Sequence, residues 1–167
     1  TSFFPAKPLG CYGDGGAVIT NNDALAEKVS IYKNYGAPKR DNYLLVGINS
    51  RLGALQATIL RVKLKYLEKW NEARRRNAKL YDRYLDDVAE ITKPMILGHN
   101  KSAFHLYVVR AGNRDGLAEH LKTKQISTLI HYPRPIHLQL GYAALGYKKG
   151  DFPAVEKAAE EILSLPI

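Results

Sequence analysis

Lys7 is the side chain in this sequence whose surroundings best suit covalent chemistry. Apolar residues flank it on both sides, namely Phe3, Phe4, Pro5, Pro8 and Leu9. A partly desolvated ammonium group loses proton affinity, which favours the neutral amine as a nucleophile in Schiff-base chemistry. Composition alone favours an ordinary surface lysine, because most lysines are solvated. From the residue types, Lys7 is therefore a candidate nucleophile in a loop.

The neighbourhood of Lys7 also suits an anionic ligand. Ser2 precedes Lys7 in the same stretch, and its hydroxyl can donate a hydrogen bond to a phosphate. Four glycines follow Lys7 and let the backbone turn tightly: Gly10, Gly13, Gly15 and Gly16. The run at residues 16–20 then predicts a short buried strand.

Candidate binding residues also occur farther along the chain. Arg51 offers a bidentate fork for a carboxylate or phosphate, or else faces solvent at the start of a helix. His131 and Tyr132 follow a predicted strand in a loop, a location that suits binding, although such a pair is more often structural. His137 and Gln139 fit a binding role and a packing role equally well. No group of cysteine, histidine and carboxylate residues has the spacing of a metal site.

The hydrophobic pattern predicts the elements that position these side chains. Residues 21–23 offer an N-cap for a helix through residue 32. Apolar residues near the 3.6-residue period predict one long amphipathic helix over residues 51–85. The remainder predicts a small α/β region. Its expected elements are a strand at 104–110, a helix at 115–124, a strand at 127–130 and a helix at 153–163.

Composition narrows the class of protein. The chain has 167 residues, of which 46% are hydrophobic, so it can build a core. The net charge of +9 invites a nucleic-acid interpretation, but the basic run at residues 74–76 is interleaved with acidic residues and favours a solvated helix face. We find neither an apolar run of membrane length nor a signal peptide. The single cysteine, Cys11, is compatible with a reducing compartment, so we expect a cytoplasmic protein.

Residues 2–17 read SFFPAKPLGCYGDGGA and closely resemble the internal-aldimine segment of the DegT/DnrJ/EryC1/StrS sugar aminotransferases. These are pyridoxal-phosphate enzymes of the aspartate-aminotransferase fold. Three further blocks resemble that family, and they occur in the family's order. They lie at residues 47–64, at residues 131–139, and at residues 150–156 with 163–166. The four blocks cover nearly the whole chain, so their joint signal is strong.

The resemblance implies an α/β fold, specifically the C-terminal part of a fold type I pyridoxal-phosphate enzyme. Residues 1–50 would end the large domain, residues 51–88 would form a long connecting helix, and residues 89–167 would form a small C-terminal α/β domain. The chain would then correspond to the C-terminal half of a family member. The aspartate on the pyridine nitrogen of the cofactor and part of the phosphate site would lie outside it.

The same resemblance implies roles for individual residues. Lys7 would form the internal aldimine with pyridoxal 5'-phosphate and then shuttle a proton. Ser2 would contact the phosphate of the cofactor, and Asn49 would reach the phosphate in a neighbouring subunit. A homodimer with shared active sites is therefore expected. The residues implied to contact the substrate are Arg51, His131, Tyr132 and His137.

Lysine at position 7 favours transamination, because related dehydratases carry histidine there. The expected reaction converts a nucleotide-linked ketosugar to an amino sugar for a polysaccharide or an antibiotic, with glutamate as donor. The lysine segment looks most like enzymes that act at C3 of a UDP-2-acetamido-3-ketoglucuronic acid, but the closing segments also occur in enzymes of deoxyketohexoses, so the sugar stays open. One alternative is a non-catalytic or regulatory member that binds a nucleotide sugar or nucleic acid. Another is a member that acts on a different keto substrate, as aminohydroxybenzoate synthase does.

Overall fold

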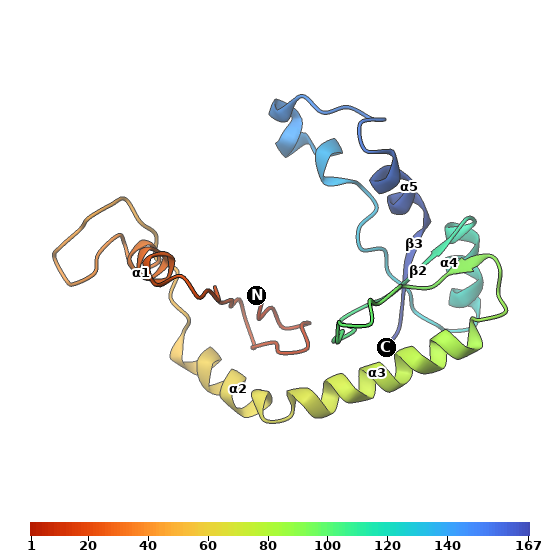
Figure 1. Cartoon of the computed structure of the whole chain (residues 1–167), viewed down its shortest axis with the longest axis horizontal. Coiled ribbons are helices and arrows are strands. Elements are labelled where there is room, and N and C mark those ends of the chain that lie inside the picture. The colour runs from red at the N-terminus through yellow and green to blue at the C-terminus, as the bar shows by residue number, and fades with distance from the viewer. The chain divides into compact units, whose positions relative to one another are not determined.

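The computed structural model describes residues 1–167, which divide into two compact units, Thr1–Trp70 and Asn71–Ile167. The division lies within helix α3 (Leu67–Tyr84), so this helix contributes residues to both units (Figure 1). The three-part division with bounds at residues 50 and 88 stays a prediction. No helix combines the length and the apolar character needed to cross a membrane.

Helix α1 (Asp23–Tyr32) confirms the first predicted helix and its cap. The Asn22 side chain accepts a hydrogen bond from the Leu25 N–H at 3.0 Å, which satisfies one of the free donors of the first turn. The chain reverses after α1 with positive φ angles at Tyr35 and Gly36, 63° and 77°. A Cβ atom on Gly36 would lie 1.8 Å from the Leu45 carbonyl oxygen, so this close approach requires glycine.

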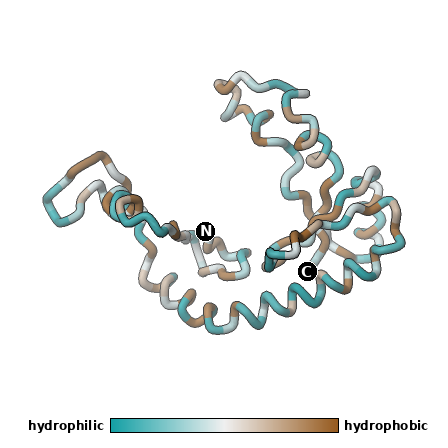
Figure 2. Tube along the Cα trace, in the orientation of Figure 1, coloured by the Kyte–Doolittle hydropathy of each residue, from teal (hydrophilic) through white to brown (hydrophobic).

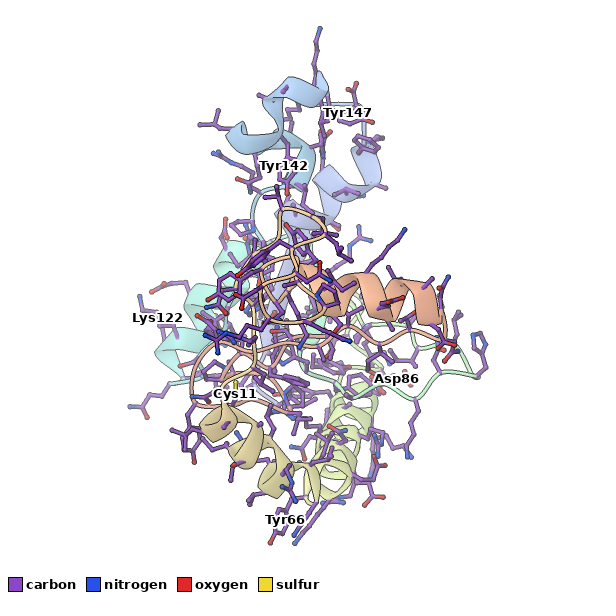
Figure 3. All side chains as sticks on the ribbon, turned by 90° about the vertical axis from the view of Figure 1, so that its left-hand side faces the viewer. Cys11, Tyr66, Asp86, Lys122, Tyr142 and Tyr147 are labelled. Atoms are coloured by element: carbon purple, nitrogen blue, oxygen red, sulfur yellow. The ribbon has the colours of Figure 1, made fainter.

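The long helix predicted over residues 51–85 is two helices, α2 (Ala54–Leu64) and α3. Between them the Lys65 and Tyr66 N–H groups donate to residues three positions back, Val62 and Lys63. This tighter pattern interrupts the α-helical ladder. Tyr66 marks the junction in Figure 3. Because no glycine or proline marks this junction and the apolar period continues through it, the sequence pattern did not reveal the break.

The strand predicted at residues 16–20 is also wrong for this structure. Only an isolated bridge between Ser2 and Gly16 forms, and Val18 and Ile19 are 62% and 84% exposed. An extended segment without a full ladder partner does not become a strand. Figure 2 shows that hydrophobic stretches recur along the N-terminal unit. Its buried hydrophobic residues are Cys11, Ala37 and Leu60.

The C-terminal unit contains a three-stranded antiparallel sheet in the order β1-β2-β3. Its strands are β1 (Ile91–Thr92), β2 (Tyr107–Ala111) and β3 (Ile162–Leu165). Val109 of β2 pairs with Leu163 of β3, and both side chains are 1% exposed. Ala78 of α3 and Tyr107 complete the fully buried cluster. This cluster is the core of the unit.

Helix α4 (Arg114–Thr123) confirms the predicted helix at 115–124, and its Leu117, Ala118 and Leu121 pack against the core. Helix α5 (Pro153–Glu161) ends before residues 162 and 163, which were predicted to be helical. Those residues begin β3 instead, because pairing with β2 buries Leu163. The predicted strand at 127–130 reduces to a single bridge between Leu129 and Ser164. Two short 3-10 helices, η1 (Ile136–Leu138) and η2 (Leu140–Leu145), precede α5 (Figure 1).

Candidate functional site

The loop that carries Lys7 folds back on itself through backbone hydrogen bonds. The Phe3 N–H donates to the Gly15 carbonyl at 2.8 Å, and the Cys11 N–H donates to the Phe3 carbonyl at 2.8 Å. Within this closure the Lys7 N–H donates to the Phe4 carbonyl at 2.9 Å. The Lys7 side chain is half-buried. The backbone around the candidate nucleophile is therefore fixed by short-range pairing.

Cys11 lies at the centre of this loop and is fully buried. Its sulfur lies 2.9 and 3.0 Å from the Phe3 and Gly13 carbonyl oxygens, and its single hydrogen can be donated to either of them. Two glycines permit this packing. A Cβ atom would lie 2.4 Å from the Pro5 carbonyl oxygen at Gly10, and 2.9 Å from the Cys11 sulfur at Gly15. Both distances are too short for a Cβ atom, so a larger residue at either position would force the loop or the Cys11 side chain to shift.

Helix α2 contacts the loop from one side, and Figure 3 shows Cys11 beside this helix. The Gln56 Oε1 atom accepts a hydrogen bond from the Tyr12 N–H at 2.8 Å. The Lys63 Nζ atom donates to the Gly10 carbonyl at 2.5 Å and lies 5.5 Å from the centre of the Tyr12 ring. Sequence reasoning gave these two residues no role of this kind. Their spacing of seven residues, which places both on one helix face, was the available signal.

Ser2 lies in the same loop as Lys7, as predicted, and is exposed. Its Oγ atom accepts a hydrogen bond from the Phe4 N–H at 3.2 Å. A hydroxyl group has one hydrogen to donate as well as lone pairs to accept. Because Phe4 occupies only a lone pair, the Ser2 hydrogen remains able to donate to an anionic ligand.

Asn49 and Arg51 form a second group in the N-terminal unit. The segment that carries them pairs with the turn after α1, through a bridge between Asn34 and Asn49. The Arg51 Nε atom donates to the Asn49 Oδ1 atom at 3.2 Å, and the guanidinium lies 5.4 Å from the centre of the Tyr35 ring. The Arg51 contact uses only the amide oxygen of Asn49, so the amide N–H groups of Asn49 can still donate hydrogen bonds to a ligand. The Arg51 Nη groups also have no hydrogen bond within the chain.

A small cavity of about 170 Å³ lies beside this second group. Its lining includes Arg51 and Lys33, together with the polar side chains of Ser30 and Asn34. Two cationic side chains and two polar ones favour an anionic group over an apolar one.

His131 and Tyr132 lie in the C-terminal unit, in the loop that precedes η1. The His131 Nδ1 atom is 2.8 Å from the Oγ atom of Ser164, a buried residue of β3. The Tyr132 ring contacts the His131 ring edge-on at 5.4 Å and is 70% exposed. Ser164 therefore fixes the histidine, and the tyrosine is left accessible. The sequence placed Ser164 in a motif without revealing this contact.

His137 lies in η1 and is held against α5. Its Nε2 atom is 3.0 Å from a Glu156 carboxylate oxygen, and its ring contacts Phe152 edge-on at 4.8 Å. Burial of the Glu156 carboxyl group raises its pKa, but hydrogen bonds from the Gly150 N–H, from His137 and from the Phe152 N–H outweigh this effect and lower the pKa overall. These contacts fix the loop between η2 and α5. A substrate contact by His137 stays a prediction, as does one by Gln139.

The family model described as the DegT/DnrJ/EryC1/StrS aminotransferase family matches residues 1–167. The erythromycin biosynthesis sensory transduction protein EryC1 of Saccharopolyspora erythraea is 48% identical over 99% of this chain and 45% of its own length. The UDP-2-acetamido-2-deoxy-3-oxo-D-glucuronate aminotransferase of Pseudomonas aeruginosa is 42% identical over 100% of this chain and 45% of its own length. The chain thus spans about half the length of the curated relatives it matches.

A solved structure is also similar to this chain. DesV of Streptomyces venezuelae, crystallised with a ketimine intermediate, superposes with a TM-score of 0.95 at 41% identity. The superposition covers 99% of this chain and 45% of that one. This similarity confirms the predicted α/β fold, the C-terminal part of such an enzyme.

Proposed function

The chain belongs to the DegT/DnrJ/EryC1/StrS aminotransferase family, and we propose that the full-length protein transfers an amino group to a nucleotide-linked ketosugar. The observation that carries the proposal is Lys7, a half-buried lysine on a loop that is closed by backbone hydrogen bonds. Glutamate is the proposed amino donor. The name of the Pseudomonas aeruginosa relative supports a ketosugar substrate without fixing which sugar this protein uses.

The side chains around Lys7 fit pyridoxal 5'-phosphate, which combines an aldehyde with a phosphate. Lys7 supplies an amine, and Ser2 supplies an exposed hydroxyl hydrogen for the phosphate. When bound, the cofactor supplies an electron sink for the bond changes at the amino-bearing carbon. The protein supplies orientation and charge.

Lys7 has two tasks in this proposal. Its Nζ atom anchors the cofactor before the amino donor arrives, and once released it accepts and returns a proton as a general base and acid. The hydrogen bond from its own backbone N–H to Phe4 fixes the start of the side chain. The Nζ end can then reach both tasks by rotation of the side chain.

Asn49 and Arg51 are proposed to act across a homodimer interface. The contact between them leaves the Asn49 amide donor and the Arg51 Nη donors free of partners within the chain. The Asn49 amide suits the phosphate of the neighbouring subunit's cofactor, and the Arg51 guanidinium suits a carboxylate or diphosphate. His131, Tyr132 and His137 are proposed sugar or nucleotide contacts. Tyr132 is the strongest candidate of these three, because its ring is accessible.

A regulatory function is the second candidate, since the EryC1 relative is named as a sensory transduction protein. In that case the protein would bind a nucleotide sugar without turning it over. Lys7 argues against this alternative, because binding alone does not need an amine on a fixed loop.

A transamination assay separates the two candidates. The full-length protein would be incubated with pyridoxal phosphate, glutamate and a panel of nucleotide-linked ketosugars, and amino-sugar product would be detected by mass. We expect product from the wild type, none from Lys7→Ala, and wild-type amounts from Lys39→Ala, an exposed lysine of the same unit. Product formation by Lys7→Ala would contradict the proposal.

A further inference from the structure

We propose that Gln56 and Lys63 of α2 are positioning residues that hold the Lys7 loop in its reactive arrangement. This inference rests on the proposed function, because it assigns both residues to the chemistry of Lys7. Neither residue needs to touch the substrate or the cofactor. Each acts through the backbone that follows Lys7.

Gln56 and Lys63 are placed for this role by the helix itself. Together with the buried Leu60 they recur at intervals of four and three residues, which places all three on one face of α2. That face carries the acceptor for the Tyr12 N–H and the donor to the Gly10 carbonyl, at 2.8 and 2.5 Å. A single rigid element therefore contacts the loop at two points.

The two points of contact bracket Cys11, which lies between Gly10 and Tyr12. Its N–H donates to the Phe3 carbonyl, and its thiol lies within hydrogen-bond distance of the same oxygen. The peptide that follows Phe3 leads to Phe4, whose carbonyl accepts from the Lys7 N–H. A shift of residues 10–12 would therefore be transmitted through Cys11 to the backbone of Lys7.

The Lys63 contact is the stronger of the two on physical grounds. Its donor is charged, its side chain is half-buried, and its ammonium also lies over the Tyr12 ring. Loss of it would leave the Gly10 carbonyl without its charged partner, at a position where the loop backbone is tightly packed. Displacement of a reacting group by about 1 Å can cost about 100-fold in rate, so a modest shift at Lys7 matters.

The test uses paired variants of the full-length protein. Gln56→Leu and Lys63→Met remove the hydrogen bonds, whereas Gln56→Glu keeps an acceptor and Lys63→Arg keeps a cationic donor. Lys65→Met is the matched control, because it removes an exposed lysine from the end of the same helix. The readout is the rate at which the visible absorption band of lysine-bound pyridoxal phosphate grows after cofactor is added to the apoprotein, with the thermal midpoint measured in parallel.

We expect Gln56→Leu and Lys63→Met to slow growth of the band about 10-fold or more, with Gln56→Glu, Lys63→Arg and Lys65→Met close to wild type. Equal rates in Lys63→Met and Lys65→Met would overturn the inference. So would equal slowing in the conservative and disruptive variants, because that pattern reports packing alone. A wild-type protein that forms no band would instead contradict the proposed function, so the two failures are distinguishable.

Discussion

Different forces stabilise the interiors of the two units of this chain. In the C-terminal unit, Tyr107, Val109 and Leu163 form a buried apolar cluster, and the Tyr107 hydroxyl donates to Asp82 at 2.6 Å. In the N-terminal unit the buried hydrophobic residues are few, and the Lys7 loop depends on hydrogen bonds and close glycine contacts. The C-terminal unit therefore has an ordinary apolar core, in which burial supplies most of the stability.

This difference shows how a chain can fix a candidate nucleophile without burying it completely. Directional hydrogen bonds and positions that exclude a Cβ atom select one loop conformation, whereas apolar contacts are non-directional and would also hide the lysine. The two kinds of order should fail separately. Variants can therefore be chosen that damage one unit and spare the other.

The largest expected effect is a core truncation in the C-terminal unit. Leu163→Ala removes a fully buried side chain and should lower the free energy of unfolding by about 2–5 kcal/mol. Denaturant unfolding of the full-length protein measures this loss, and Leu140→Ala, at an 86% exposed position of the same unit, is the control. The cofactor should still attach to Lys7 under conditions where the variant is folded. Loss of attachment in that folded variant would break the distinction between the units.

The converse variant is Gly10→Ala in the N-terminal unit. The added Cβ atom would meet the Pro5 and Phe4 carbonyl oxygens at 2.4 and 2.7 Å, so the loop must shift, at a cost of about 1–3 kcal/mol. We expect loss of most cofactor attachment, measured by absorbance, with the C-terminal core intact. Gly98→Ala, where a Cβ atom would meet nothing within 4 Å, controls for the substitution itself. Normal attachment in Gly10→Ala would show that the loop tolerates repacking.

The smallest expected effect is a pH dependence of the stability of the C-terminal unit, which arises from Glu156. The folded state lowers the pKa of this carboxyl group below its ordinary value of 4.5. The stability that it contributes is therefore present above about pH 4.5 and is lost as the pH falls through the lowered pKa. The thermal midpoint of the wild type should exceed that of Glu156→Gln near neutral pH, and the difference should shrink as the pH falls below about 4.5. A difference that is constant with pH would assign the effect to packing.

Local signals in the sequence predicted the elements that depend on local contacts. The α1 helix follows from its Asn22 cap, and α4 follows from its apolar spacing. Residues 162 and 163 were predicted to be helical because α5 leads into them, yet β2, more than fifty residues earlier, pairs with them and makes them a strand. Such long-range pairing overrides local propensity, and no local pattern reports it.

The candidate site divides in the same way. Lys7 and Ser2 could be linked from the sequence because they share a short motif, and their roles stay predictions. Gln56 and Lys63 could not be linked to that loop, because they lie 44 and 53 residues from their partners Tyr12 and Gly10. The contact of His137 with Glu156 was missed for the same reason.

The central claim is that Lys7 is the lysine that binds the cofactor. The most direct measurement incubates the full-length protein with pyridoxal phosphate, reduces it with borohydride, digests it and locates the added mass by peptide mass spectrometry. We predict that the label lies on the peptide containing Lys7 and that Lys7→Arg abolishes it. A label on another lysine, or a protein that takes up no label, would contradict the account.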